Sequence, residues 1–132
     1  MEKDFDAIVE RILEKDLRYK EDAYAFVMEA LAFTQRKLKA VRHVSSQELL
    51  AGIKELIISE FGPMALTVLE HWGIKSTQDF GNIVFNLVEN KILSKTEDDN
   101  IDTFRDVYDF EEEFYQKYRM QLAKKIGRMR SI

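Results

Sequence analysis

The sequence predicts a mainly helical fold of the small α+β class, forming a single domain over residues 1–132. We expect one half of it to resemble a winged helix-turn-helix and to carry one short β-hairpin. Two observations support this prediction. The chain contains only one proline and five glycines, so few positions interrupt helices. Apolar residues also recur three and four positions apart along most of the chain, which is the period of an amphipathic helix. With 132 residues, of which 45% are hydrophobic, the chain can bury one core without disulfides or metals.

Apolar stripes and caps predict the helices in order. These helices span residues 5–15, 21–39, 46–61, 63–72, 77–90 and 109–126. Asp4 is placed to cap the first helix. The second helix carries a wide apolar stripe from Tyr24 onward and ends in the basic run RKLKAVRH, which suits the negative end of a helix dipole. Ser45 and Glu48 have the spacing of a capping box, so the third helix begins directly after Ser45.

Turn residues predict the elements of the second half. Gly62 ends the third helix, and the proline after it suits the first turn of the fourth, which closes at Gly73. Ser76 offers a cap for the fifth helix. Residues 92–96 and 103–108 are short apolar runs on either side of an acidic loop, so they predict an antiparallel hairpin. The last helix has apolar residues at a regular four-residue spacing: Phe110, Phe114, Tyr118, Leu122 and Ile126.

Charge is separated along the C-terminal third of the chain. Residues 97–113 hold nine acids and the single base Arg105, which gives a local net charge of −8. Residues 114–132 hold six bases and no acid. The whole chain has a formal net charge of −4, which argues against a dedicated nucleic-acid-binding protein.

Nucleic-acid binding is nevertheless the alternative that the element order suggests. From residue 45 to 108 this order matches a winged helix-turn-helix, in which the second helix of the motif enters the major groove. Residues 77–90 would then form an exposed recognition helix, and the basic segments 36–42 and 124–130 would contact phosphates. The candidate contacts are Arg36, Lys37, Lys39, Arg42, Lys75, Thr77, Gln78 and Lys95. The 77–90 helix contains no arginine, and the acidic hairpin loop would repel phosphate, so this function is not the preferred one.

The residue types favour a non-enzymatic interaction or adaptor protein. The chain has no cysteine, and its two histidines, His43 and His71, have no companions at metal-binding spacing. We therefore predict no catalytic residues, metal or cofactor, and a cytoplasmic protein that has no membrane partner. The predicted partner is another protein or a second copy of the chain. The predicted contact surface is the aromatic stripe of the last helix: Phe110, Phe114, Tyr118 and Leu122.

Several stretches resemble one small bacterial protein family of uncharacterised function. They include YAFVMEALAFTQRK, FGPMALTVLEHWGI and DFGNIVFNLVE, and the resemblance covers residue 5 to about residue 115. Leu17 stands where the pattern of that family has proline. The resemblance implies a stand-alone cytoplasmic protein and no particular activity. The basic stretch after residue 115 lies outside it.

Overall fold

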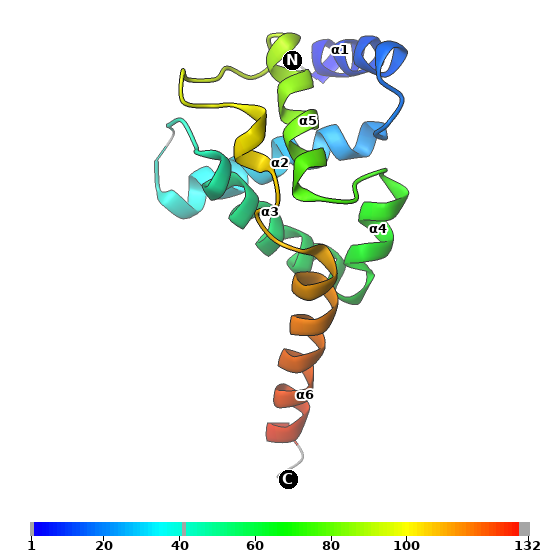
Figure 1. Ribbon diagram of the computed structural model, residues 1–132, viewed down its shortest axis with the longest axis vertical. Coiled ribbons are helices and arrows are strands. Elements are labelled where there is room, and N and C mark those ends of the chain that lie inside the picture. Colours follow the sequence, from blue (N-terminus) through cyan, green and yellow to red (C-terminus); the bar gives the residue numbers. More distant parts are fainter. Residues whose placement is uncertain (1, 41, 130–132) are drawn as a thin grey trace.

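The computed structural model describes residues 2–40 and 42–129, and these are mainly helical, as the sequence predicts (Figure 1). The α-helices are α1 (Glu2–Lys15), α2 (Glu21–Leu38), α3 (Ser46–Phe61), α4 (Ala65–His71), α5 (Thr77–Glu89) and α6 (Lys117–Met129). Two 3₁₀ turns, Gly62–Met64 and Ile101–Phe104, and one π-helical turn, Glu112–Gln116, lie between them. We refer to α1 to α5 together as the helical body.

Most helix boundaries follow the predicted caps. The Ser45 hydroxyl accepts a hydrogen bond from the Glu48 amide at 3.1 Å, and the Ser45 amide donates to the Glu48 carboxylate at 3.0 Å, so the capping box is confirmed. Gly62 ends α3 with a φ of 48°, a conformation that favours glycine. The cap predicted at Asp4 is wrong, because α1 begins at Glu2 and Asp4 lies inside it.

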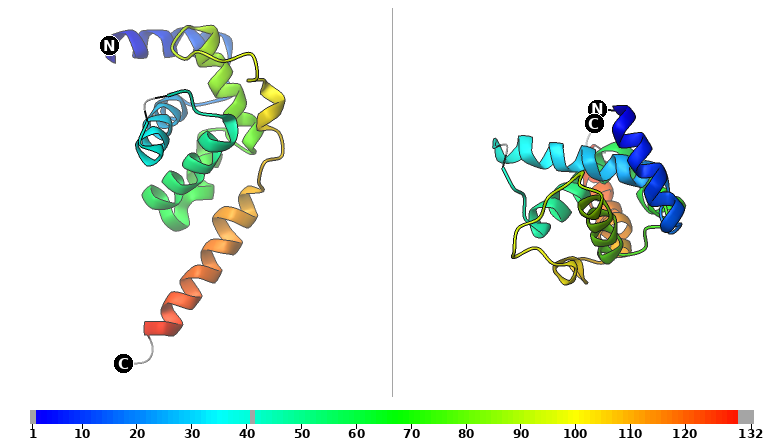
Figure 2. Two further views of the ribbon diagram at one scale, coloured as in Figure 1. Left: turned by 90° about the vertical axis from the view of Figure 1, so that its left-hand side faces the viewer. Right: turned by 90° about the horizontal axis from the view of Figure 1, so that it is seen from above.

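Helix α5 is the central helix of the body. Phe80, Ile83 and Leu87 on α5 are completely buried. Over residues 77–88, α5 has no exposed side chain, and only its last residue, Glu89, is exposed. Helix α2 packs against one side of it and the Ile101–Phe104 turn against another, and Figure 2 shows α5 nearly end-on among these neighbours. An enclosed helix of this kind organises a core and cannot present a free face to a partner.

Helices α2 and α3 approach each other closely at Gly52. A Cβ atom added to Gly52 would lie 1.9 Å from the hydroxyl oxygen of Thr34 on α2. Thr34 is buried, and its hydroxyl donates a hydrogen bond of 2.7 Å to the Ala30 carbonyl. The space between the two helices therefore requires glycine at position 52.

An aromatic cluster holds the end of α4 against α2 and α3. The ring centroids of Phe26 and Trp72 are 5.3 Å apart, and those of Phe61 and Trp72 are 5.7 Å apart in an edge-on arrangement. Gly73 follows with a φ of 86°, and a Cβ atom there would lie 2.1 Å from the Arg18 carbonyl oxygen. The turn between α4 and α5 can therefore pass beneath the α1–α2 linker only because residue 73 has no side chain.

The predicted hairpin at 92–96 and 103–108 is wrong, since the described residues contain no β-strand. After α5 the chain turns back onto the end of that helix, where the Ile92 and Leu93 amides donate to the Leu87 carbonyl at 3.0 and 3.3 Å. Phe104 is buried against α5, and its carbonyl accepts a hydrogen bond from the Thr77 hydroxyl. These backbone groups are satisfied by α5, so they are not available to pair with each other as strands.

Without that hairpin the predicted wing is absent from the described part of the chain. Asn100 accepts a hydrogen bond from the Asp102 amide at 2.7 Å and begins a 3₁₀ turn in the segment where the acidic loop of a wing was expected. The turn between α4 and α5 is present, but α5 is enclosed. The winged helix-turn-helix prediction therefore fails in its strands and in the exposure of its second helix.

A pair of glycine substitutions tests the close approach of α2 and α3. We expect Gly52→Ala to lower the free energy of unfolding by about 1–3 kcal/mol, because the added methyl group overpacks the contact with Thr34. Gly127→Ala on α6 is the matched control, since a Cβ atom there meets nothing within 4 Å. Alanine also favours helix, so the control should gain up to about 1 kcal/mol. Equal effects of the two changes in urea unfolding would contradict the packing described above.

Candidate interaction surface

The C-terminal helix is anchored to the body at its first turns, which we call the root (residues 109–116). Phe110 and Phe114 are buried, with ring centroids 5.4 Å apart, and both rings pack within 6.1 Å of the Tyr108 ring. The Tyr108 hydroxyl donates to the Leu50 carbonyl at 2.8 Å, and burial raises the pKa of this tyrosine. The root is thus fixed to α3 and α5 by an aromatic cluster.

Ion pairs secure the point at which the helix leaves the body. The Glu113 carboxylate accepts a hydrogen bond from Lys117 at 2.8 Å and lies 3.7 Å from the ammonium of Lys54 on α3. The hydrogen bond from Lys117 has the largest effect and lowers the pKa of Glu113, and the charge of Lys54 lowers it further. Tyr118 lies against the end of α3. A Cβ atom added to Gly62, which ends α3, would be 3.3 Å from the Tyr118 hydroxyl. Beyond Tyr118 the helix continues past the end of the body.

The remainder of α6 projects away from the body, as Figures 1 and 2 show from different directions. No residue of Lys117–Met129 is buried. Several large apolar side chains are nevertheless present there, and Leu122, Ile126 and Met129 are 44%, 48% and 60% exposed. Complete burial of a fully exposed side chain of this size stabilises by about 1.5–3 kcal/mol, and roughly half of that remains to be gained at each of these positions, so covering this helix would be favourable.

The exposed apolar residues form one stripe. We define the apolar stripe as Tyr115, Tyr118, Leu122, Ile126 and Met129. These residues are spaced three or four positions apart, which places them within about a quarter of the helix circumference. Met120 is also exposed but lies near the opposite side of the helix. A narrow stripe of this kind is typical of a helix that packs along another helix.

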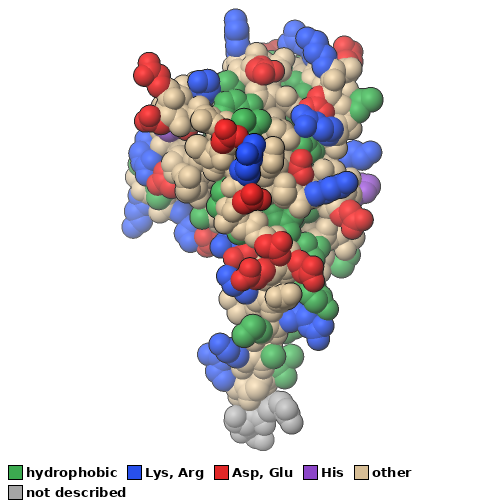
Figure 3. Space-filling model, viewed as in Figure 1, with side chains coloured by type: hydrophobic (Ala, Val, Ile, Leu, Met, Phe, Trp, Pro, Cys, Tyr) green, Lys and Arg blue, Asp and Glu red, His purple; other side chains and the backbone are tan. Residues whose placement is uncertain are grey.

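The charges along the C-terminal helix are separated by position. The root carries the acids Asp109, Glu111, Glu112 and Glu113, whereas Lys117–Met129 carries five bases and no acid. Figure 3 shows acidic side chains gathered at the root, with basic and hydrophobic side chains on the projecting part below. Three of the bases, Lys124, Lys125 and Arg128, lie at the end of the helix, which we call the tip (residues 124–129).

A groove of about 640 Å³ lies beside the root. We call it the root groove, and it runs between α4 and the start of the C-terminal helix. Its apolar lining comes from Leu66, Leu69, Ile74, Phe110 and Tyr115, and its polar lining from Glu70, Lys75, Asp109 and Glu111. Tyr115 belongs to both the groove and the apolar stripe, so the two surfaces are continuous. Acids outnumber bases on the groove.

The sequence predicted this surface only in part. Phe110 and Phe114 are buried in the root, so their prediction as an exposed partner surface is wrong. Tyr118 is half-buried, and Leu122 is exposed as expected. Ile126 and Met129 complete the surface and were not among the predicted contacts. The signal that could have found them is their helical spacing in a segment with no other predicted element to cover it.

The predicted nucleic-acid contacts on α5 are not exposed. Thr77 is completely buried, and Gln78 is half-buried. Asp79 and Asn82 of this helix are bonded within the fold: the Tyr19 hydroxyl donates to the Asp79 carboxylate and accepts from the Asn82 amide at 2.8 Å. The expectation of an exposed recognition helix is therefore wrong.

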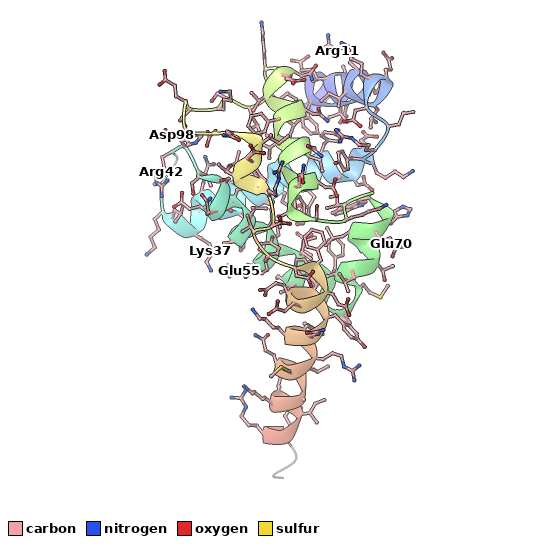
Figure 4. The ribbon with its side chains drawn as sticks, viewed as in Figure 1. Arg11, Lys37, Arg42, Glu55, Glu70 and Asp98 are labelled. Atoms are coloured by element: carbon pink, nitrogen blue, oxygen red, sulfur yellow. The ribbon has the colours of Figure 1, made fainter. Side chains whose placement is uncertain are left out.

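The remaining predicted contacts lie in separate places. Arg36, Lys37, Lys39 and Arg42 are exposed near the end of α2. Lys37 pairs with Glu55 at 2.6 Å and Arg42 with Glu48 at 2.9 Å, and Figure 4 shows Lys37 and Arg42 on the opposite side of the view from Glu70. The Arg42 guanidinium lowers the pKa of Glu48 to about 2.

Lys95 and Lys75 also belong to different surfaces. Lys95 shares a cavity of about 300 Å³ with Arg42 and His43, whereas Lys75 lines the root groove. The predicted bases therefore form no single basic face.

A second polar network joins the end of α1 to α5. The Arg18 guanidinium donates to the Asp16 carboxylate at 2.7 Å, and the Asn86 amide donates to Asp16 and to the Tyr24 hydroxyl at 3.0 Å each. The hydrogen bond from Arg18 holds the pKa of Asp16 well below its usual range. Burial raises the pKa of Tyr24. The network satisfies polar groups inside the fold and explains why α5 carries asparagines on an enclosed face.

Among residues 2–40 and 42–129, no group of three or more His, Asp or Glu side chains is arranged to hold a metal ion. The helices of the described chain include none with the length and apolar character needed to cross a membrane.

Comparisons with protein-family models, with curated proteins and with solved structures find no match to this chain. The resemblance to a small bacterial family of uncharacterised function therefore stays a prediction.

The Asp16 network makes stability depend on pH. Because the folded-state pKa of Asp16 is lowered, its contribution is present above the unfolded-state pKa of about 3.9 and is lost as pH falls toward the folded-state value. We expect Asp16→Asn to lower the free energy of unfolding at pH 7 by about 1.5–3 kcal/mol, because a charged hydrogen-bond network is lost.

Denaturant unfolding at a series of pH values measures this effect. The variant should lose less stability than the wild type between neutral pH and acid. Glu10→Gln, which removes an exposed carboxylate of α1, is the control and should change stability little at pH 7. Parallel pH profiles of Asp16→Asn and the wild type would contradict the assignment.

Proposed function

We propose that this chain is a non-enzymatic interaction protein whose binding element is the projecting part of α6. The observation that carries the proposal is an amphipathic helix that projects from the body with an apolar stripe in which Tyr115, Leu122, Ile126 and Met129 are exposed. Exposed apolar surface on a protein of this size is costly in water unless a partner covers it. The helical body then serves to hold the root and to direct the helix outward.

Helix-in-groove recognition is the mode that this geometry supports. In that mode an amphipathic helix places residues at i, i+3, i+4 and i+7 in an apolar groove of its partner. Tyr115, Tyr118 and Leu122 have this spacing, and Ile126 and Met129 extend it. The bases beside the stripe favour a partner surface that carries acidic residues.

Nucleic-acid binding remains a second candidate function for one reason. The five bases of Lys117–Met129 have no acid among them, and the helix projects into solvent where phosphates could reach it. The acidic root and the net charge of −4 oppose this function.

Photo-crosslinking tests the interaction function. A photoreactive phenylalanine analogue is placed at Leu122 in the full chain, within cells that naturally make the protein, and at Met120 as the matched control. Both positions are exposed and they lie two residues apart, but only Leu122 belongs to the apolar stripe. We expect discrete crosslinked products from Leu122 and few from Met120. Identical products from the two positions, or none from Leu122, would overturn the proposal.

Fluorescence anisotropy tests the nucleic-acid function with random-sequence duplex DNA and single-stranded RNA. We expect no binding at physiological salt, because phosphate contacts would need a basic face that the body does not provide. Binding that weakens steeply with salt would contradict this expectation. If the tip made those contacts, Lys124→Glu/Lys125→Glu/Arg128→Glu would reduce the salt dependence by about one unit of slope per lost contact.

A further inference from the structure

We infer that the partner of α6 is a second copy of this chain, and that the two C-terminal helices pair antiparallel, each tip lying on the root of the other copy. This inference rests on the proposed function and names the partner. It follows from three features of the described residues: the position of the apolar stripe, the order of charges along the helix, and the root groove.

The order of charges selects the antiparallel arrangement. The root carries Asp109, Glu111, Glu112 and Glu113, and the tip carries Lys124, Lys125 and Arg128. Two parallel helices would place acids beside acids and bases beside bases. Two antiparallel helices place each acidic root beside a basic tip at both ends of the pair. Antiparallel pairing also sets the two helix dipoles in opposition, which favours it further.

The apolar stripe suits antiparallel pairing. A pair whose two-fold axis passes between Tyr118 and Leu122, close to the middle of the stripe, brings Tyr118 of one copy against Leu122 of the other. Such a contact occurs twice in a symmetric dimer, because a two-fold axis makes the interface use the same patch on both copies. The tip residues Ile126 and Met129 then extend toward the root of the other copy.

The root groove receives that tip. Its apolar lining, which includes Leu66, Leu69 and Tyr115, is continuous with the stripe, so one surface can bury the whole projecting helix. Glu70, Asp109 and Glu111 line the same groove, which otherwise carries only Lys75 among charged residues. The groove therefore offers apolar contact and acidic charge to a helix end that carries apolar side chains and bases.

A second copy fits these features better than an anionic lipid surface. The stripe covers about a quarter of the helix circumference, whereas a helix that lies in a membrane interface buries a wide apolar face and commonly uses Trp or Phe. The described residues Lys117–Met129 contain neither Trp nor Phe. A lipid surface would also bring its negative charge close to the acidic root.

Sedimentation equilibrium of the purified full chain measures the association directly. We expect a mass twice the 15.6 kDa of one chain. Leu122→Asp/Ile126→Asp should weaken self-association by more than about tenfold, since each change puts a charge into the apolar contact. Met120→Asp is the matched control on the opposite side of α6 and should leave the mass unchanged. No residue of Lys117–Met129 is buried, so these variants keep the folded body, which circular dichroism verifies.

Charge reversal tests the antiparallel arrangement. Lys124→Glu/Lys125→Glu/Arg128→Glu places acidic tips against acidic roots and should shift the protein to monomer. Adding Glu70→Lys and Glu111→Lys to the same chain gives the root groove a net positive charge, complementary to the acidic tip, and should restore the dimer. If the tip charges acted only within their own helix, the changes at Glu70 and Glu111 would not restore the dimer.

The outcomes separate this inference from the proposed function. A monomeric wild-type chain overturns the inference. If the Leu122 crosslinker then captures a different protein in cells, the interaction function stands with another partner. If the monomer instead floats with vesicles of anionic phospholipid, the surface that α6 recognises is a membrane, and the inference is again overturned. A dimer that survives tip reversal overturns the antiparallel pairing.

Discussion

The arrangement of the body depends on the hydrogen bonds that the Asp79 carboxylate accepts. One oxygen accepts hydrogen bonds from the Lys75 and Ser76 amides, at 2.7 and 3.2 Å, and so closes the first turn of α5. The other oxygen accepts from the hydroxyl of Tyr19, which lies in the linker between α1 and α2. One side chain thus begins the central helix and ties to it a part of the chain 60 residues away. Because Tyr19 is almost fully buried, this contact also closes the core at that end of α5.

Because α5 is enclosed, we propose the C-terminal helix as the interaction element. Asn82 and Asn86 of α5 donate hydrogen bonds to groups inside the fold. The buried apolar residues of α5 form part of the core. At the other end of the body the aromatic cluster of Phe110 and Phe114 fixes the root of the last helix. The body therefore provides a base for the projecting helix, on which several exposed apolar side chains lie in a row. That division is the physical basis for the function we propose.

Local sequence signals predict where the helices begin and end, but they do not predict which helices and turns contact each other. The capping box at Ser45 depends on residues three positions apart, so the sequence alone can reveal it. Short apolar runs next to turns are typical of strands, so the sequence predicts a hairpin after α5, whereas the structure has none there. The conformation of this segment depends on Phe104, which packs against Gly81 on α5. The two residues are far apart in the sequence, so no local pattern predicts their contact. For the interaction surface, the separation of charge was visible in the sequence. The burial of Phe110 was not, because it depends on where the body ends.

The π-helical turn Glu112–Gln116 determines which way the projecting helix faces. In a regular α-helix, residues four positions apart are rotated by about 40° with each step, so a four-residue pattern winds gradually around the helix. The wider π turn reduces that rotation, and Phe110, Phe114 and Tyr118 all stay on the side that touches the body. Because a π turn holds one residue more than an α turn, rewinding it as regular α-helix with all its residues kept would rotate everything after it by about 100°, the rotation of one residue, relative to the root. The turn therefore sets the rotational phase of the apolar stripe, and a change that rewound it as α-helix would redirect the stripe without altering any of its side chains.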